Sequence, residues 1–439
     1  MRPMYAGIGW KDILVIQTMS VVMRSPVVMW RGRIKVVNQQ KVGVIGGGQL
    51  AWMMAIAAQK IGIELSVQAA NDQEPAVAIA DRVVYGKVSD AKATAKLAEH
   101  CPVITFENEF VDLEALQTLE NSDRFHHAYH NFKFLPRLAT LEISVDKLKQ
   151  RQHFRDHQIP TPTFYAVDQE SDLINAAANL GYPLVLKSRR HGYDGKGTWV
   201  IKNVEELQTA WTSIHQAPAI AEAFIPFEQE LAVIAARTLH GDIVIYPVVE
   251  TLQIDQVCRR TIAPARVSPA IAAEVERIAK QIMVSLDAIG VIGIEFFLTA
   301  SAEVTVNEIA PRTHNSGHYT IEGCHTSQFE QLLRVVSGLP LGDVSMAVPV
   351  AIMINLLGTE GYADNDPDYL HQRKAIASFP NTFIHWYGKS SSLGRKLGHV
   401  TVCAPTYDTA LAISDRIEKI WYGSSQNADT ESISNKRFS

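Results

Sequence analysis

A strand, a glycine turn, a helix and a second strand follow one another soon after residue 40. The expected strands of this region are residues 42–45, 63–67, 83–85 and 102–106, and the expected helices are 51–61 and 90–100. A helix that connects two consecutive strands in this way returns the chain to the same sheet, so the strands run parallel. The pattern therefore predicts an α/β domain with a parallel sheet.

The glycine run at 46–48 lies where backbone N–H groups at a helix N-terminus could hold an anion. The run fits only the looser dinucleotide frame, with Gly46, Gly48 and Ala51. Gln68 stands where an acidic residue would bind the ribose of NAD. A mononucleotide-sized phosphate is therefore expected here, and an NAD-dependent dehydrogenase is the weaker alternative.

Residues 292–309 have the pattern of a hairpin with two apolar strands. If Thr299 faces Val304, then Glu295 lies directly opposite Glu308 on one face of the hairpin. Two carboxylates at this separation repel each other, and a magnesium ion held by both would compensate. An exposed hairpin face with two unrelated glutamates is the alternative.

A second glycine-rich segment, residues 191–197, follows a strand that ends at Lys187. Its glycines allow a tight turn whose backbone N–H groups could cradle phosphate, with Lys187 and Lys196 beside them. The segment is not a Walker A loop, because Ser or Thr does not follow Lys196 in the required frame. A plain hairpin turn is the alternative.

Two further clusters carry groups that could bind anions. Residues 312–318 combine an arginine, two histidines and asparagine just after the glutamate pair, which suits a small oxyanion. Residues 394–399 place Arg395 and Lys396 in a glycine-bounded turn. Structural hydrogen bonds for the histidines and a solvated basic turn are the alternatives.

Charge and cysteine content exclude several classes of protein. The formal net charge is −5 with no basic excess, so no nucleic-acid partner is expected. The four cysteines lie far apart and form no CxxC pair, which predicts neither a disulfide framework nor a zinc site. Residues 13–30 are fairly apolar, but Gln17, Ser20 and Arg24 interrupt them, so a membrane span is not expected.

The order of these motifs resembles that of the ATP-grasp ligases. More closely, it is similar to the family of ATP-dependent N5-carboxyaminoimidazole ribonucleotide synthetases of purine biosynthesis. The resemblance covers about residues 41–423 and rests on segments 46–50, 105–109, 189–197, 307–318 and 394–399. Segments 189–197 and 307–318 are highly specific together, because other ATP-grasp enzymes share the metal carboxylates but not the run that follows them. Another ATP-grasp carboxylate–amine ligase is the main alternative.

The resemblance implies an α/β ATP-grasp fold with an N-terminal Rossmann-like parallel-sheet domain and a small β-rich C-terminal domain. The expected divisions are an extension at 1–38, the Rossmann-like domain at 39–142, an ATP-grasp domain at 143–338 with a lid at about 160–225, a C-terminal domain at 339–423 and a tail at 424–439. Residues 121–142, which include three histidines, are expected to form a loop rather than a metal site.

The resemblance also implies roles for matching residues. ATP would be bound by Lys147, Lys187, Gly192, Tyr193, Asp194, Gly195, Lys196, Gly197, Thr198, Glu222, Ala223, Phe224, Ile225, Glu230, Gln253, Asn307 and Glu308. Glu295 and Glu308 would hold Mg²⁺, as two ions. Gln253 stands where a nucleotide-contacting histidine often lies, so that contact is left open.

The remaining implied roles concern the other two substrates. Arg312, His314 and Asn315 would hold bicarbonate and then carboxyphosphate, and Asp194 would lie near the reacting amine. Aminoimidazole ribonucleotide would be held by Gly48, Gln49, Glu107, Arg395 and Lys396. The resemblance further implies a homodimer whose product passes to a separate mutase. The dispersed cysteines indicate the cytoplasm, and no membrane partner is expected.

Overall fold

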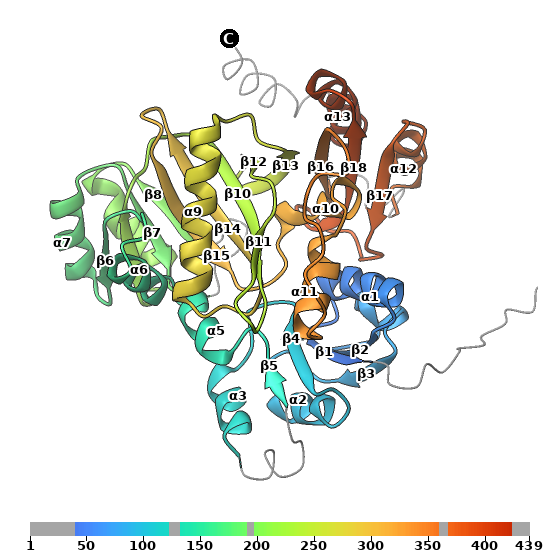
Figure 1. Ribbon diagram of the computed structural model, residues 1–439. Helices are drawn as coiled ribbons and strands as arrows, with labels where there is room; N and C mark the ends of the chain where they lie inside the picture. The colour runs from blue at the N-terminus through green and yellow to red at the C-terminus, as the bar shows by residue number, and fades with distance from the viewer. Residues whose placement is uncertain (1–39, 123–131, 191–196, 360–367, 424–439) are drawn as a thin grey trace, which may run out of the picture. The chain divides into compact units, whose positions relative to one another are not determined.

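The structure is a computed structural model, and it describes residues 40–122, 132–190, 197–359 and 368–423. All of them belong to one contact unit, residues 39–439. The described residues form three β-sheets, which helices cover (Figure 1). None of the helices among these residues is long and apolar enough to cross a membrane. The expected N-terminal extension and C-terminal tail lie outside the described residues.

The N-terminal sheet is parallel throughout, with its five strands in the order β3-β2-β1-β4-β5. The strands are β1 (Lys41–Ile45), β2 (Glu64–Ala69), β3 (Arg82–Tyr85), β4 (Val103–Phe106) and β5 (Lys133–Phe134). The helices are α1 (Gln49–Ile61), the 3-10 helix η1 (Pro75–Ala78), α2 (Ala91–Ala98) and α3 (Leu113–Glu120). Val44, Val67 and Ile104 are fully buried, as expected of strands covered on both faces. The predicted parallel sheet is confirmed.

The loop predicted at 121–142 is wrong in its second half. The strand β5 and most of the helix α5 (Leu138–Val145) lie there, while residues 123–131, with the three histidines, lie outside the described residues. Leu138 and Leu141 are buried on one side of α5, and Leu135 is buried just before it. Apolar residues three apart are the helical signal that the polar first half of the segment obscured.

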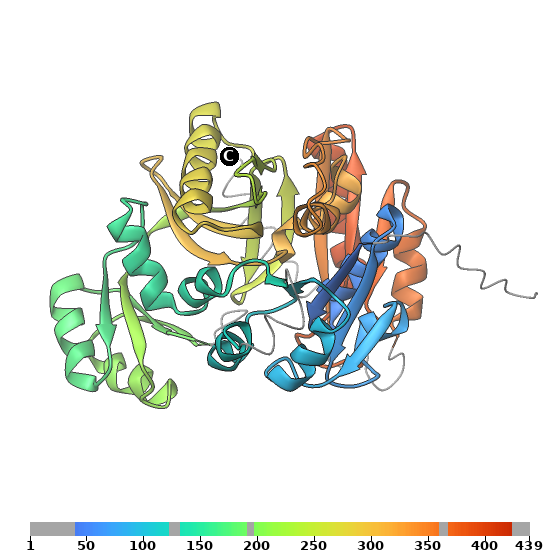
Figure 2. The same cartoon turned by 60° about the horizontal axis from the view of Figure 1, so that its bottom comes forward.

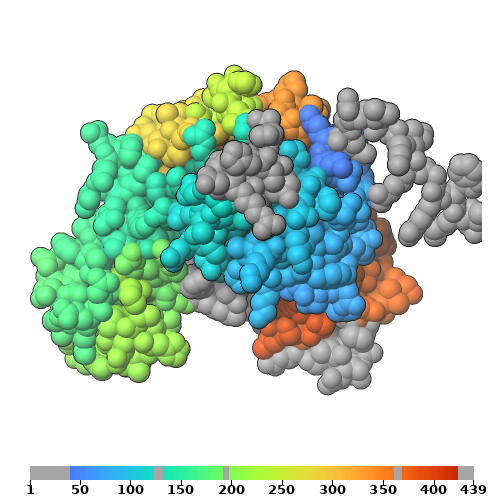
Figure 3. Space-filling view, turned by 90° about the horizontal axis from the view of Figure 1, so that it is seen from below, coloured from blue at the N-terminus to red at the C-terminus, as the bar shows by residue number. Residues whose placement is uncertain are grey.

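A small antiparallel sheet follows, with its strands in the order β6-β9-β7-β8. The strands are β6 (Phe164–Val167), β7 (Leu184–Ser188), β8 (Thr198–Ile201) and β9 (Ala219–Ala223). The helices α7 (Glu170–Leu180) and α8 (Leu207–Ser213), with the 3-10 helix η2 (Val204–Glu206), pack on it. Figure 3 shows this part of the chain in green, beside the blue and cyan N-terminal sheet domain.

The third sheet has nine strands, in the order β15-β14-β10-β12-β13-β16-β18-β17, with β11 paired to β10. The strands are β10 (Phe227–Arg237), β11 (Ile243–Ile245), β12 (Val249–Ile254), β13 (Val257–Ala263), β14 (Gly290–Thr299), β15 (Val304–Ala310), β16 (Val350–Leu357), β17 (Thr382–Trp386) and β18 (Lys396–Ala404). Because β13 pairs with β16, the sheet is continuous from the glutamate hairpin into the C-terminal region.

Helices cover this large sheet along its length (Figure 2). They are α6 (Lys147–Asp156), α9 (Pro269–Ser285), η3 (Asn315–Gly317), α10 (Thr320–Gly323), α11 (Gln328–Val336), α12 (Leu370–Ala377) and α13 (Tyr407–Tyr422). The helix α9 begins with Ser268 as its N-cap and Pro269 at the first helical position. Its Val275, Ile278 and Ile282 are fully buried against β10 and β14. The ATP-grasp architecture with a β-rich C-terminal region is confirmed.

The segment 243–249 is divided between two strands in the structure. Its first part is β11 and its last residue begins β12, with Pro247 between the two. Proline has no N–H to donate to a strand ladder, so the chain leaves β10 there and pairs again two residues later.

Candidate active site

A cavity of about 1450 Å³ lies where the three sheets approach one another. Its walls come from the loops after β1 and β4, from the strands β7 and β8, from the hairpin of β14 and β15, and from residues 388–396 before and at the start of β18. Most of the residues expected to bind substrates therefore line a single space.

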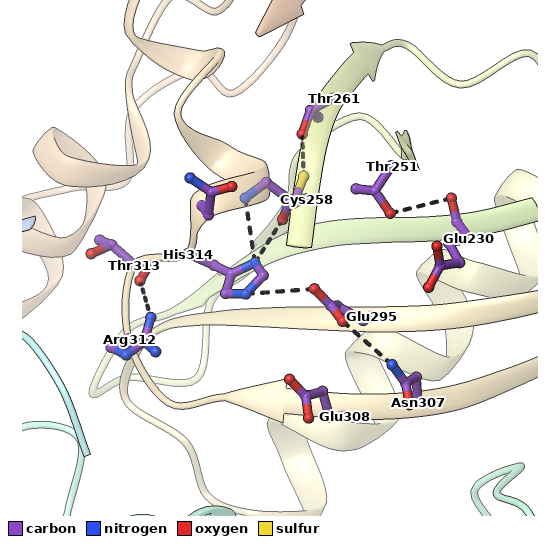
Figure 4. A network of polar contacts seen from close by, with 12 residues as sticks. Glu230, Thr251, Cys258, Thr261, Glu295, Asn307, Glu308, Arg312, Thr313 and His314 are labelled. Atoms are coloured by element: carbon purple, nitrogen blue, oxygen red, sulfur yellow. Dashed lines mark hydrogen bonds and ion pairs between the residues drawn. The ribbon is translucent and has the colours of Figure 1, made fainter. Parts of the chain in front are cut away.

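The glutamate pair lies on the floor of this cavity, and a β-bulge places it there. Leu298 rather than Thr299 faces Val304, so the predicted register is wrong by one residue near the turn. The register then shifts at Asn307, and Glu295 does face Glu308 as predicted. Figure 4 shows Glu295, Asn307 and Glu308 on these two neighbouring strands.

The bulge follows from the spacing of buried residues in β15. Val304, Val306 and Ile309 are buried, so the last step is three residues instead of two. One residue must be inserted for Ile309 to reach the core, which leaves Asn307 and Glu308 together on the cavity face.

The two carboxylates have different charge environments. Burial, together with the nearby Glu308, raises the pKa of Glu295. Burial would also raise the pKa of Glu308, but the Lys147 ammonium 2.6 Å away lowers it well below its usual range. Asn307 Nδ2 lies 3.4 Å from Glu295 and donates to it. The raised pKa of Glu295 reflects burial and repulsion between the two carboxylates, and a divalent cation held by both would favour the ionised form of Glu295.

The second predicted lysine, Lys187, contacts a different carboxylate. Its Nζ lies 2.8 Å from Glu222 and donates to Asn307 Oδ1 at 3.2 Å. Glu222 also accepts from Nε of Arg151 at 2.6 Å, and these cations hold its pKa at about 2 despite burial. The Glu222 side chain thus belongs to a buried ion cluster.

Arg151, which no sequence motif indicated, completes this buried ion cluster. It lies on α6, four residues after Lys147, and donates to the Asn307 carbonyl at 2.5 Å as well as to Glu222. Side chains four apart share one helix face, which was the available signal. The helix is anchored by Asp146, its N-cap, which also accepts two bonds from Arg189.

The wall beside Lys187 is mainly apolar. The segment 222–225, whose four residues are all predicted to bind ATP, lines the cavity with Val185, Phe227 and Leu252. Phe227 stacks on Phe297 with ring centroids 4.6 Å apart. A flat aromatic base would fit such a wall. Gln253, whose contact with the nucleotide was left open above, also lines the cavity.

The predicted glycine-rich lid is only partly described. Gly192, Tyr193, Asp194, Gly195 and Lys196 lie outside the described residues. Gly197 has φ +84° and its carbonyl accepts from Ser188 N, which closes the base of the hairpin between β7 and β8. Thr198 and Glu230 both line the cavity.

His314 is oriented so that Nε2 of its imidazole ring faces Glu295. Both the side-chain oxygen and nitrogen of Gln328 bond its backbone, at 2.9 Å and 2.7 Å. Its Nδ1 accepts from the Ser316 backbone N–H at 3.4 Å and lies 2.8 Å from the Ser316 hydroxyl. With Nδ1 as acceptor, we assign the proton of the neutral ring to Nε2, which lies 3.6 Å from Glu295. Burial and the nearby Arg312 lower the pKa of His314 to about 4. Gly293 leaves room for it, since a Cβ there would lie 2.4 Å from the His314 Cβ.

Asn315 forms a reciprocal amide pair with Asn355 of β16. Asn315 Nδ2 donates to Asn355 Oδ1 at 3.0 Å, and Asn355 Nδ2 donates to Asn315 Oδ1 at 2.7 Å. Asn355 Nδ2 also donates to the Cys258 carbonyl, which fixes the orientation of both amides. The C-terminal region thereby positions Asn315, which is predicted to bind bicarbonate. Arg312, the third such residue, forms an ion pair with Glu109.

The glycine turn after β1 contains a carboxylate of the chain itself. Glu107 accepts from Gly48 N at 2.7 Å and from Leu50 N at 3.1 Å, and burial raises its pKa. The N-terminus of α1 therefore already has its anion, which disfavours both the mononucleotide phosphate expected at this turn and the pyrophosphate of a dinucleotide. Gly48 and Gln49 still line the cavity.

Lys389 is the second residue that the motifs missed. It lines the cavity beside Arg395 and Lys396, and its Nζ donates to Gln49 Oε1. Burial lowers its pKa to about 8, although Glu107 opposes that change. Arg395 donates to the carbonyl and hydroxyl of Ser390, which keeps the turn in place. Three cations thus surround one end of the cavity.

The residues present fit a magnesium ion better than a transition metal. Among the described residues, no group of three or more His, Cys, Asp or Glu side chains could hold a metal ion. The glutamate pair with Asn307 offers hard oxygen donors from only two carboxylates. Magnesium accepts such a set, because substrate phosphates and water complete its coordination.

Comparison with known protein families finds matches in three parts of the chain. Three family models match it: a ribonucleotide synthetase preATP-grasp domain at residues 39–131, an ATP-grasp domain at 152–329, and a phosphoribosylaminoimidazole carboxylase C-terminal domain at 351–413.

Individual relatives match over most of their length. An N5-carboxyaminoimidazole ribonucleotide synthase of Synechococcus elongatus is 50% identical, covering 83% of this chain and 89% of the relative. The enzyme of that name from Synechocystis is 44% identical, covering 87% and 98%. The carboxyaminoimidazole ribonucleotide synthase of Aspergillus clavatus, solved with ADP and 5-aminoimidazole ribonucleotide, superposes with a TM-score of 0.80 at 33% identity, covering 88% and 99%.

Proposed function

The chain belongs to the N5-carboxyaminoimidazole ribonucleotide synthase family of ATP-grasp ligases, and we propose here how its residues perform that reaction. The activity is the ATP-dependent carboxylation of 5-aminoimidazole ribonucleotide in purine biosynthesis. The observation that carries the proposal is the opposed pair Glu295 and Glu308, set in one cavity with cations and imidazole on either side.

ATP is proposed to bind between the small sheet and the hairpin. The base lies against segment 223–225 and the Phe227 wall, and the phosphates extend toward Lys147 and Lys187. Both lysines are paired with carboxylates in the structure, Lys147 with Glu308 and Lys187 with Glu222. Phosphate binding then exchanges one negative partner of each lysine for another, which lowers the cost of bringing the triphosphate into the cavity.

Two magnesium ions are proposed to bind with the nucleotide at Glu295 and Glu308, with Asn307 beside them. When bound, they would neutralise charge on the transferring phosphoryl group. A cation held by Glu308 would take the place of Lys147 at that carboxylate, and Lys147 would then be available to the phosphates.

Bicarbonate is proposed to bind next to the glutamate pair, at Arg312, His314 and Asn315. There its oxygen attacks the γ-phosphorus of ATP, which gives carboxyphosphate and ADP. The chain contributes mainly orientation, because phosphoryl transfer needs reactants held in line rather than covalent help. The buried neutral His314 presents its Nε2–H to this space without adding a full charge.

5-Aminoimidazole ribonucleotide is proposed to bind at the other end of the cavity. Its phosphate lies among Arg395, Lys396 and Lys389, with Gln49 and Glu107 toward the ribose. Carboxyphosphate breaks down to CO₂ and inorganic phosphate. The exocyclic amine then captures the CO₂ as a carbamate and loses a proton, inside a cavity that limits the access of water. The role of Asp194 near this amine stays a prediction from the family resemblance.

We also propose that the enzyme acts in the cytoplasm as a homodimer and that its product passes to a separate mutase. The homodimer and the mutase follow from the family resemblance. A cytoplasmic location agrees with the lack of paired cysteine motifs in the sequence.

ADP release tests the substrate and the glutamate pair together. With Mg²⁺-ATP and bicarbonate, we expect addition of the ribonucleotide to stimulate ADP release strongly. Glu308→Gln should lose about 100-fold or more of this rate, because the uncharged amide holds neither the cation nor Lys147 as well. Glu303→Gln, in the exposed turn of the same hairpin, is the matched control and should keep the full rate. An equal rate with and without the ribonucleotide would reject the substrate assignment.

A further inference from the structure

Arg312 is held by a carboxylate from another part of the molecule. Its Nε donates to Glu109 Oε2 at 2.6 Å and its Nη2 donates to Glu109 Oε1 at 3.1 Å. Glu109 lies in the loop between β4 and α3 of the N-terminal sheet domain, 203 residues before Arg312. A two-point contact of this kind fixes the plane of a guanidinium as well as its place.

The contact lies in the active-site cavity rather than on the outer surface. Both residues line the cavity, and the side chains of Glu109 and Arg312 are only 22% and 18% exposed. Although burial opposes it, Arg312 lowers the pKa of Glu109, so the carboxylate stays charged at neutral pH. At such burial the pair is screened much less than a surface ion pair.

The ion pair with Glu109 leaves some N–H groups of the Arg312 guanidinium available to a ligand. Nη1 donates to the Thr313 carbonyl at 3.1 Å, so three of its five N–H groups have partners among the described residues. One N–H remains on each terminal nitrogen. Two such groups on one planar cation match two oxygens of a small planar oxyanion.

We propose that Glu109 is a positioning residue, which sets the guanidinium plane of Arg312 so that its two remaining N–H groups bind bicarbonate. The proposal rests on the proposed function, which places bicarbonate at Arg312. It adds that the bicarbonate site is complete only when the N-terminal sheet domain supplies Glu109. Asn355 holds Asn315 from the C-terminal side in a comparable manner.

Other roles for Glu109 predict different effects of its removal on bicarbonate binding. If the Glu109 carboxylate occupied the position of bicarbonate itself, its removal would free Arg312 and bicarbonate would bind more tightly. If the pair only joined two parts of the fold, its removal would lower the unfolding temperature and leave substrate binding unchanged.

Steady-state kinetics of Glu109→Gln separate these roles. We expect the KM for bicarbonate to rise about ten-fold or more, since a charged hydrogen-bond pair that orients the ligand is lost. The KM for ATP should stay within about two-fold, and Glu109→Asp should recover part of the loss because it keeps the charge. Glu99→Gln is the matched control, because it removes one exposed carboxylate of the same domain outside the cavity lining.

Two results would overturn the proposal. One is a bicarbonate KM in Glu109→Gln that is unchanged or lower, whatever the unfolding temperature of the variant. The other is an equal rise in the KM values for ATP and bicarbonate, which would indicate general distortion of the cavity. Failure of the proposed function is distinct, because the wild-type chain would then show no bicarbonate-dependent ADP release.

Discussion

At the scale of single residues, the site depends on how buried charges are paired. Lys147 and Lys187 each contact a carboxylate in the structure. The nearby cations do not offset the burial of Glu295 and its repulsion by Glu308, so its pKa is raised. A buried charge without a partner is costly, so each group here is adjusted to its neighbours. The sequence indicated which residues carry charge, but these pairings depend on side-chain positions that motifs do not specify.

The lowered pKa of Lys389 predicts a pH dependence for ribonucleotide binding. Burial depresses this pKa to about 8, so the ammonium is charged below pH 8 and neutral above it. A phosphate prefers the charged form, so the KM for the ribonucleotide should rise as pH increases, by about ten-fold one unit above the pKa. Lys389→Arg should remove this dependence, because arginine stays charged throughout.

Steady-state kinetics between about pH 7 and 9, on either side of this pKa, check the prediction. The KM for the ribonucleotide is measured across the range, and the KM for ATP serves as an internal reference. A wild-type profile that stays flat over this range, or one that Lys389→Arg leaves unchanged, would show that Lys389 does not bind the phosphate.

Gly293 should be required for the placement of His314. A Cβ at this position would lie 2.4 Å from the His314 Cβ and 2.7 Å from its Cγ, both too close for real contacts. Gly293→Ala should therefore displace the ring and lower kcat by about ten-fold or more through misplacement of the bicarbonate site. Activity and thermal unfolding should be measured together, and a fully active variant would contradict the role given to His314.

At the scale of elements, the β-bulge of β15 explains both the success and the error of the hairpin prediction. A regular two-residue alternation places Glu295 opposite Glu308 only if Thr299 faces Val304, and it does not. The inserted Asn307 restores the pairing. The three-residue spacing between Val306 and Ile309 contained this information, but it is visible only once the buried face is known.

Arg151 should be the residue on α6 that matters most for stability. Its side chain and that of Glu222 are each only 2% exposed. In Arg151→Met, the buried Glu222 carboxylate keeps Lys187 as its one remaining cationic partner. This loss should lower the free energy of unfolding by about 3–5 kcal/mol. Urea denaturation of the variant gives this quantity directly.

Arg155→Met on the same helix is the matched control. The side chains of its ion pair with Asp156 are 62% and 59% exposed, so the loss should be about 0–1 kcal/mol. Equal costs for the two substitutions would contradict the account of a buried ion cluster.

At the scale of the whole molecule, the cavity is assembled from segments that are remote in sequence. The parallel sheet was predictable because its short apolar strands and glycine turn are local patterns. The contacts of Glu109 and Asn355 were not predictable. Glu109 is 203 residues from its partner Arg312, and Asn355 is 40 residues from its partner Asn315. Only the fold brings such residues together, and nothing in their local sequence marks them.

The fate of labelled bicarbonate tests the central claim most directly. We would incubate the enzyme with ¹³C-bicarbonate, 5-aminoimidazole ribonucleotide and Mg²⁺-ATP, and follow ¹³C-carbamate formation by NMR beside ADP release. The account predicts a carbamate on the exocyclic amine, formed in equal amount with ADP and absent without ATP. ADP release without carbamate, or enzyme-dependent carbamate formation without ATP, would contradict it.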